Sequence, residues 1–374
     1  MSSVRSPGLC PDSCDGRLEV DGRLAVDGRL AVDGRLEAAP RPSADAFRLQ
    51  STARMYELLA DRYEIQGYMD SGGTAEIYLA NDRWLQRWVV IKQLTAELAD
   101  NPEVRSRFLR EAAAAQQIDH PNVVKVEAVI EPRDQPPFLV MEALVGETLG
   151  DMLRRETCLP VPQVLRLVRE IASALAATHA AGIVHRDVKP DNVFLLGPRG
   201  APEGVKLIDF GMAKIKTVAC SGIVLGTAQY MAPEQVLVEP VDGRTDVYGL
   251  GVMMFRMLTG HLPFESEPRA DMLRHQLFSP PPPASWLCDE LDPSVDAIVL
   301  KAMRKHPENR YPSMLALLDD VLAAIDAEPE RASSPDLVIA PDRYRPNSEE
   351  GEAAFKLLAR KFGKFAEMPG ANDV

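Results

Sequence analysis

Short apolar runs separated by turn-forming residues open the central part of the chain and predict β-strands. Residues 63–69 and 76–80 flank a turn of small residues, and residues 88–92 follow as a third strand. Two further runs, 123–130 and 138–142, come after a stretch that suits a helix. Consecutive strands joined by short turns pair in antiparallel fashion. The pattern therefore predicts a small antiparallel sheet of five strands.

Apolar residues at helical spacing dominate the rest of the chain. The predicted helices cover residues 103–117, 161–181, 245–258, 291–305 and 312–325. Only the first of these lies among the strands. We therefore expect an α+β fold of two lobes, with a β-rich lobe that has one helix over residues 63–142 and a larger, mainly helical lobe over 143–326.

The first 54 residues carry a short repeat rather than a domain-like pattern. The sequence Asp-Gly-Arg-Leu begins at Asp15 and recurs three times, the last copy starting at Asp33. Asp-Gly pairs favour turns, and the Leu and Val positions could form very short strands between them. So small a unit buries little apolar surface, so we expect residues 1–54 to be disordered. Two alternatives stay open here: a docking function for this tail and, at Met55, a later translational start.

The last part of the chain, residues 327–374, divides into a linker and a candidate amphipathic helix. Beyond Asp326 the composition turns to Glu, Pro, Ser and Asp, which suits a linker. Within residues 349–368 one helical face is apolar and basic residues surround it: the apolar face is Phe355, Leu358, Phe362 and Phe365, and the basic residues are Lys356, Arg360, Lys361 and Lys364. Three interpretations stay open, since this helix can pack back on the domain, dock to a partner or lie on a membrane surface.

Charge and cysteine content narrow the class of partners and the compartment. The formal net charge of −13 over 374 residues argues against nucleic acid as the main partner. Five scattered cysteines indicate a reducing compartment, and Cys10 and Cys14 lack the second pair expected of a zinc site. No apolar run approaches the roughly 18–20 residues that span a bilayer. We therefore expect a cytoplasmic protein without a transmembrane segment.

A polar stretch between two apolar runs, residues 184–193, carries the clearest chemistry. It reads Val-His-Arg-Asp-Val-Lys-Pro-Asp-Asn-Val, so that Lys189 and Asn192 follow the acid Asp187. In phosphoryl transfer an acid accepts the hydroxyl proton, an ammonium group neutralises the moving phosphoryl, and an amide oxygen binds Mg²⁺. A solvated charged turn is the structural alternative. The full string favours phosphoryl transfer, which also requires groups that bind nucleotide and metal.

Four further pieces of the sequence could supply such groups. Residues 70–75, Asp-Ser-Gly-Gly-Thr-Ala, form a turn whose glycines let backbone N–H groups approach phosphate oxygens, although such a turn is often an ordinary hairpin. Lys92 ends an apolar strand, and Glu111 lies on the following helix, where it can hold that lysine. Asp209 follows the strand 205–208 and aims a carboxylate off a sheet edge, where it can bind a metal.

In this order and spacing, the motifs resemble the protein kinase family over roughly residues 63–326. Phe-Leu-Arg-Glu at 108–111, Leu-Val-Met-Glu at 139–142 and Gly-Thr-Ala-Gln-Tyr-Met-Ala-Pro-Glu-Gln at 226–235 are similar to the eukaryotic-like Ser/Thr kinases of bacteria. The resemblance implies an enzyme that transfers the γ-phosphoryl of Mg-ATP to Ser or Thr hydroxyls of proteins. Lys189 fits this branch, because tyrosine kinases usually differ at that position.

The resemblance also implies catalytic roles for the matching positions. Lys92 would hold the α- and β-phosphates and pair with Glu111. Asp187 would orient the substrate hydroxyl and accept its proton, while Lys189 steadies the γ-phosphate. The Mg²⁺ ligands would be Asn192 and Asp209.

The ATP-binding positions follow from the same resemblance. The loop over the phosphates would be Asp70, Ser71, Gly72, Gly73, Thr74 and Ala75. Around adenine, Glu142 and Leu144 would offer backbone groups and Met141 would guard the pocket behind. The ring would lie between the apolar side chains of Ile77, Val90 and Phe194.

Three more matching positions would have structural roles. Glu234 would form a buried ion pair with Arg310, and Asp246 would brace the catalytic loop. Their loss should impair folding or activation rather than the chemical step.

Arg186, beside Asp187, is similar to the arginine of kinases that phosphorylation switches on. Its cation needs an anionic partner, and Thr217 and Ser221 are the candidate acceptors for autophosphorylation, while Thr227 would hydrogen-bond the catalytic loop. No sensor domain is recognisable, so a regulatory protein or a homodimer is a candidate source of the signal.

Two positions depart from the family pattern. Asp70 stands where a glycine is usual, and a carboxylate near a triphosphate would weaken ATP binding by about 1 kcal/mol unless it turns to water or to a backbone N–H. Ala115 replaces a larger apolar residue and would loosen the helix of Glu111. Both favour an alternative function, a pseudokinase that senses nucleotide without turnover. The five residues that the chemistry needs are nevertheless all present, so we expect catalysis.

Overall fold

The computed structural model describes residues 57–71, 74–199, 202–209, 228–265, 269–288 and 291–327, together with three short strands near the N-terminus. By their contacts, residues 1–50 and 51–374 are two separate units. In the first unit, β1 (Ala25–Val26), β2 (Arg29–Val32) and β3 (Arg35–Ala38) form an antiparallel sheet in that order. Each of the last three repeats thus contributes one strand. The disorder expected for the tail as a whole stays a prediction.

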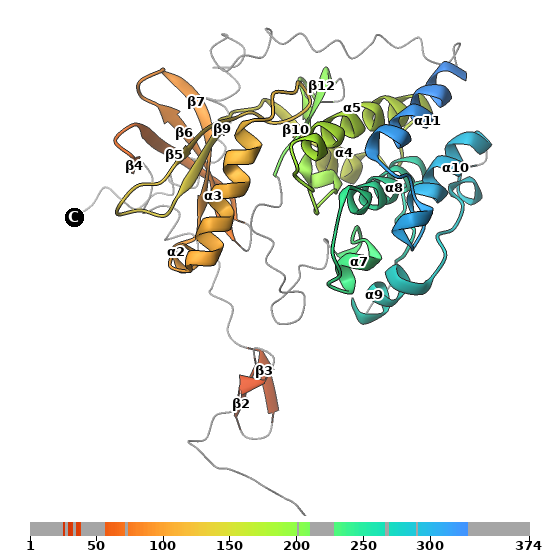
Figure 1. The fold of residues 1–374 in the computed structure, drawn as a ribbon, viewed down its shortest axis with the longest axis horizontal. Coiled ribbons are helices and arrows are strands. Elements are labelled where there is room, and N and C mark those ends of the chain that lie inside the picture. The colour runs from red at the N-terminus through yellow and green to blue at the C-terminus, as the bar shows by residue number, and fades with distance from the viewer. Residues whose placement is uncertain are drawn as a thin grey trace, which may run out of the picture. The chain divides into compact units, whose positions relative to one another are not determined.

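An antiparallel sheet of six strands, in the order β4-β5-β6-β7-β9-β8, opens the second unit (Figure 1). Its strands are β4 (Leu58–Leu59), β5 (Tyr63–Ser71), β6 (Ala75–Asp82), β7 (Arg87–Leu94), β8 (Val126–Ile130) and β9 (Phe138–Glu142). The sheet has one strand more than the sequence predicted. The extra strand β4 has two residues, too few for any periodic pattern, and it is held because Leu59 is buried where it pairs with Tyr63.

Two helices accompany this sheet, the short α2 (Ala96–Ala99) and the longer α3 (Pro102–Gln116). Asn101 caps α3 because its side chain accepts hydrogen bonds from the backbone N–H groups of Glu103 and Val104. The helix lies beside the sheet in Figure 1 and packs on β8 with its buried face, Val104, Phe108, Ala112 and Ala115. This packing fixes where Glu111 lies relative to the strands.

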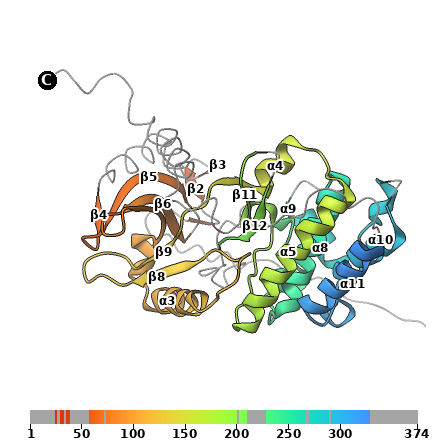
Figure 2. The same ribbon diagram turned by 90° about the horizontal axis from the view of Figure 1, so that it is seen from above.

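The larger lobe is mainly helical. Its α-helices are α4 (Leu149–Arg155), α5 (Val161–Ala180), α7 (Pro233–Val236), α8 (Gly243–Thr259), α9 (Arg269–Phe278), α10 (Pro293–Ala302) and α11 (Met314–Ala327), and its 3₁₀ turns are η1 (Pro190–Asn192), η2 (Ala284–Trp286) and η3 (Pro307–Asn309). Helix α8 is buried along nearly its whole length and contacts α5, α10 and α11 (Figure 2). It ends at Gly260, whose φ is +79° and where a Cβ atom would lie only 2.7 Å from Thr157 O, so a side chain would not fit.

A small antiparallel sheet joins the two lobes at the site. It consists of β10 (Gly146–Thr148), β11 (Val193–Leu196) and β12 (Gly204–Leu207). Val123 forms a parallel bridge with Leu207 of β12, which is why β8 begins at Val126 rather than at 123 as predicted. One core cluster continues from α3 through this junction into α5 and α8.

The two-lobed α+β fold is therefore confirmed, while the exact domain boundaries stay predictions. Within the described residues, no helix is both long and apolar enough to cross a bilayer.

Candidate functional site

The predicted catalytic loop, between α5 and β11, is held from below by Asp246 of α8. One oxygen of this buried carboxylate accepts a hydrogen bond from the backbone N–H of Arg186 at 2.8 Å. The other accepts from the N–H of His185 at 2.8 Å and lies 2.7 Å from Nε2 of His179. The carboxylate thus fixes two consecutive peptide groups next to Asp187, as expected for a brace.

Backbone strain marks the same place. Arg186 and Asp209 have φ values of 65° and 57°, in the left-handed region that non-glycine residues rarely adopt. Such conformations persist only where the surrounding structure enforces them, and they concentrate at functional sites. One strained residue precedes the carboxylate of Asp187 and the other carries the carboxylate of Asp209.

Asp187 is buried, and one of its oxygens both pairs with a cation and accepts a hydrogen bond. Its Oδ2 lies 3.2 Å from Nζ of Lys189 and accepts a hydrogen bond from Nδ2 of Asn192 at 3.0 Å. Asn192 Nδ2 also donates to the backbone carbonyl of Asp187 at 2.8 Å. Because both donor contacts use the amide nitrogen, the amide oxygen of Asn192 is turned away from Asp187 and can serve as a metal ligand. The structure brings the three residues of the motif together.

The end of β12 is held against this loop, which brings the two predicted Mg²⁺ ligands close in the backbone. The N–H of Ile208 donates to the carbonyl of Asn192 at 2.9 Å. His185 accepts from the N–H of Asp187 through Nδ1, so its Nε2 carries the proton and donates to the carbonyl of Ile208 at 3.3 Å. Asp209 is the next residue, and its carboxylate is 38% exposed.

Lys92 pairs with Asp209 rather than with Glu111, which corrects the expected ion pair. A salt bridge joins its Nζ to Oδ1 of Asp209, and among the described residues no ion pair joins Lys92 to Glu111. The physical reason is that two carboxylates compete for one ammonium group. In this structure Asp209 is the one within ion-pair distance of Nζ.

Glu111 is left buried without full compensation. Its Oε2 has no hydrogen-bond partner in the described part of the chain. Burial raises the pKa of Glu111, and the nearby cations, led by Arg186, only partly oppose this. Nε of Arg186 is also buried without a partner there. The charge interaction between Arg186 and Glu111 was not predicted, since 75 positions separate the two residues in the sequence and they lie on different lobes.

The strand register places the predicted nucleotide positions on one face of the large sheet. Ile77 pairs with Lys92, and Val90 pairs with Met141. Directly paired residues lie on the same face, and so do residues two apart on one strand. Ile77, Val90, Lys92 and Met141 therefore share a face, on which Ile77 and Val90 stay partly exposed.

The remaining adenine positions lie where the lobes meet. Leu144 and Phe194 are partly exposed, Phe194 on β11 where it pairs with Thr148. The backbone N–H of Glu142 donates to Lys125 O at 3.1 Å, so the carbonyl is the group that Glu142 can offer to adenine. The loop over the phosphates is less complete, because Gly72 and Gly73 lie outside the described residues.

The described part of this loop shows where the carboxylate of Asp70, which was expected to weaken ATP binding, lies. Its side chain is exposed, and Oδ1 accepts a hydrogen bond from the backbone N–H of Ser71 at 2.8 Å. Thr74 is partly exposed, and Ala75 is buried at the start of β6. The carboxylate has therefore turned to a backbone N–H, the condition under which repulsion of a triphosphate is reduced.

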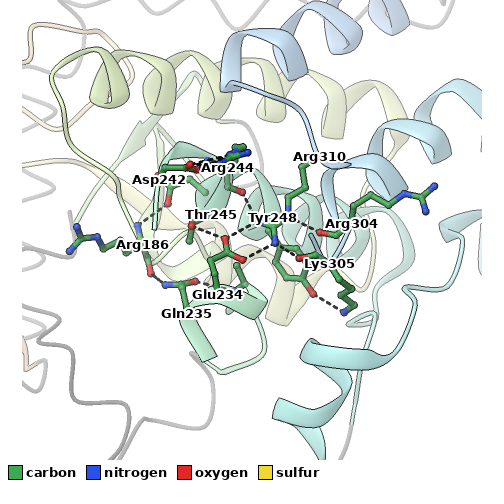
Figure 3. Close-up of polar contacts among 12 residues, drawn as sticks. Arg186, Glu234, Gln235, Asp242, Arg244, Thr245, Tyr248, Arg304, Lys305 and Arg310 are labelled. Carbon is green, nitrogen blue, oxygen red and sulfur yellow. Dashed lines mark hydrogen bonds and ion pairs between the residues drawn. The ribbon is translucent and has the colours of Figure 1, made fainter. Parts of the chain in front are cut away.

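A buried ion pair fixes the segment that follows the candidate site (Figure 3). Arg310 donates from Nη1 and Nη2 to the two oxygens of Glu234, each at 2.8 Å. Burial opposes the ionisation of Glu234, but the Arg310 hydrogen bonds and charge hold its pKa below the ordinary value. Gln235 then donates to the carbonyl of Arg186 at 2.9 Å, a contact between this segment and the catalytic loop that the sequence did not predict.

Several predicted positions lie outside the described residues. They are Thr217, Ser221 and Thr227, so the activation-loop phosphorylation sites and the contact of Thr227 with the catalytic loop stay predictions. Ala115 itself is fully buried in the core cluster of α3.

Comparison with known proteins agrees with this geometry. Residues 63–322 match the protein kinase domain. A probable serine/threonine-protein kinase of Corynebacterium efficiens is 37% identical over 76% of this chain and 46% of its own length. The serine/threonine-protein kinase pkn3 of Myxococcus xanthus is 33% identical over 76% of this chain and 54% of its own. The chain thus spans about half the length of these curated relatives.

Solved structures are similar as well. The crystal structure of the PknI kinase domain of Mycobacterium tuberculosis matches this chain with a TM-score of 0.57 and 27% sequence identity. The match covers 72% of this chain and 98% of the PknI chain. The fold is thus that of a two-lobed kinase domain, in which the candidate catalytic loop lies between the lobes. The chain belongs to the protein kinase domain family.

Proposed function

We propose that this protein is a Ser/Thr protein kinase that transfers the γ-phosphoryl of ATP to protein hydroxyls. The observation that carries the proposal is the cluster of Asp187, Lys189 and Asn192, in which one buried carboxylate oxygen is held by both donors. The names of the similar bacterial proteins support the choice of Ser and Thr as acceptors.

The residues present fit Mg-ATP. Asn192 offers an amide oxygen and Asp209 a partly exposed carboxylate, an oxygen-only donor set that suits Mg²⁺. When bound, the ion would neutralise charge on the phosphate oxygens. The shared face of Ile77, Val90 and Met141 would hold adenine, and Lys92 would bind phosphate oxygens when it leaves Asp209.

Within this function, Asp187 orients the acceptor hydroxyl and takes its proton. Lys189, 3.2 Å from the same carboxylate, places a positive charge where the transferred phosphoryl group would lie. The strained backbone and the brace of Asp246 keep both groups in place before substrate arrives. Activation-loop phosphorylation at Thr217 or Ser221, opposite Arg186, is the regulation we propose.

The test compares phosphoryl transfer to a protein acceptor by the wild type and by Asp187→Asn. The variant should lose roughly 10²–10⁴ of kcat while it still binds ATP, because the amide cannot accept the proton. The control is Asp191→Asn, an exposed acid in the same loop, which should stay active. If the wild-type protein binds ATP but transfers no phosphoryl group, it is a pseudokinase. Asp70 and Ala115 are the two positions that favour this alternative.

A further inference from the structure

Helix α11 carries a second row of apolar side chains beside its core-facing side, and two of these four side chains are exposed. Its core-facing side is formed by Met314, Leu317, Val321 and Ala324. A second set, spaced i, i+3, i+7 and i+10, forms what we call the outer stripe of α11: Leu315, Leu318, Leu322 and Ile325. Leu318 and Ile325 are partly buried and pack at the edge of the core, whereas Leu315 is 59% exposed and Leu322 is 39% exposed. A surface helix ordinarily has polar residues opposite its buried face, so this stripe indicates a missing partner.

Two acidic residues border the outer stripe. Asp319 lies one turn after Leu315 and one turn before Leu322, and Asp326 lies one turn after Leu322. Both are exposed, and among the described residues neither takes part in an ion pair or a side-chain hydrogen bond. Asp320, on the other side of the helix, accepts a hydrogen bond from Tyr311 at 2.7 Å. The partner of the stripe should therefore be apolar along its centre and basic at its sides.

The chain itself contains a segment of that description. Residues 349–368 repeat the same i, i+3, i+7, i+10 spacing with Phe355, Leu358, Phe362 and Phe365, and their basic residues are Lys356, Arg360, Lys361 and Lys364. We propose that residues 349–368 pack as a helix along the outer stripe of α11. The four large apolar side chains of this segment would cover Leu315, Leu322 and the exposed parts of Leu318 and Ile325. Its lysines and arginine would neutralise Asp319 and Asp326.

The connecting chain is long enough for this return. About 20 residues separate the end of α11 from residue 349, and an extended chain of that length reaches about 65 Å. Helix α11 has 14 residues and spans about 21 Å. The segment can therefore lie along α11 in either direction.

Three other exposed apolar side chains of the larger lobe fit a helix less well. Phe278, Trp286 and Leu287 are 74%, 74% and 57% exposed. They come from the end of α9, from η2 and from the residue after η2, so they do not line one helix face. α11, which contacts α5 and α10 in the larger lobe (Figure 2), presents the four-residue stripe that matches the spacing of residues 349–368.

The test is amide hydrogen exchange of residues 349–368 in the full chain, at a protein concentration low enough to keep copies apart. The wild type should show protection in this segment. Leu322→Asp should lower that protection at least about tenfold, because it places a carboxylate at the centre of the contact. Leu322 is already partly exposed, so the variant should keep the unfolding midpoint of the kinase domain. Leu287→Asp, which changes an exposed leucine elsewhere, is the matched control and should leave the protection unchanged.

Charge reversal tests the second element of the interface. Asp319→Lys combined with Asp326→Lys should weaken the protection of residues 349–368, and added salt should have less effect on that variant than on the wild type. Four results would overturn the proposal. They are an unprotected segment in the wild type, protection insensitive to Leu322→Asp, protection that grows with protein concentration, and protection that requires vesicles of phosphatidylcholine and phosphatidylglycerol. The third would identify a second copy as the partner, and the fourth a membrane surface.

Discussion

Two sets of buried charges lie on either side of the catalytic loop, and they differ in how completely they are paired. Around the segment after the site, every N–H group of the Arg310 guanidinium donates a hydrogen bond, to Glu234 and to the carbonyls of Arg244, Arg304 and Lys305. Where the lobes meet, Glu111 and Glu170 each keep one oxygen without a hydrogen bond in the described residues.

This difference indicates which part of the site is fixed and which part can rearrange. A buried charge with all its partners resists movement, because breaking any contact leaves an uncompensated ion. A buried carboxylate that lacks partners gains by finding one, so its element is free to move toward a cation. The catalytic loop is therefore fixed from the larger lobe, while the contacts of Lys92 and Glu111 can exchange.

The largest expected effect is on the fully paired side. Arg310→Met should lower the free energy of unfolding by about 3–5 kcal/mol, because it leaves Glu234 buried without its counterion. Chemical denaturation measures this value. Arg244→Met is the matched control: it removes a partly exposed ion pair to Asp242 and should change stability by less than about 1 kcal/mol.

A double variant sharpens the same prediction. Adding Glu234→Gln to Arg310→Met should recover part of the loss, because no buried charge then remains unpaired. If Arg310→Met alone is as stable as the wild type, the pair does not fix this segment and the contrast with the lobe junction disappears.

The next effect concerns Glu170 of α5, at the junction. Its Oε2 accepts hydrogen bonds from Asn122 Nδ2 and from the N–H of Val205, both at 3.1 Å. Burial raises the pKa of Glu170 to about 7, against the pull of Arg169 and these two donors. Between the ordinary pKa and about 7, the folded state thus binds more protons than the unfolded state, so stability falls as pH rises through this window.

Glu170→Gln should remove that dependence. The amide oxygen can still accept both hydrogen bonds, so the variant should match the wild type near pH 4.5 and exceed it above pH 7 by up to about 3 kcal/mol. Unfolding curves across this pH range measure the difference. Glu239→Gln, which changes an exposed acid, should show none. If the free energy of unfolding depends on pH in the same way for the wild type and Glu170→Gln, ionisation of Glu170 does not destabilise the folded state.

The contrast between the two regions also explains which contacts of the site could be predicted from the sequence and which could not. The Asp187, Lys189 and Asn192 cluster is local, because its spacing within one loop decides its geometry, and the structure brings these residues together as predicted. The Glu234 and Arg310 pair follows from family resemblance. The pairing of Lys92 with Asp209 was not predicted, since two carboxylates from distant elements can compete for its ammonium group. Glu170 was missed because its burial depends on Asn122 and β12, both far away in sequence.

The smallest expected effect on stability, and the one that separates the regions most clearly, is at Glu111. Glu111→Gln removes a buried charge that lacks a hydrogen bond on one oxygen, so the fold should be unchanged or more stable by about 1 kcal/mol. Phosphoryl transfer should nevertheless fall by roughly 10–100-fold, because a neutral amide holds Lys92 less strongly than a carboxylate when the ammonium leaves Asp209. Lys92→Met is the matched variant and should lose activity without a large loss of stability. If Glu111→Gln destabilises the protein as much as Arg310→Met, the junction is as firmly held as the larger lobe. If Glu111→Gln stays fully active, Lys92 acts with Asp209 alone and needs no exchange of partners.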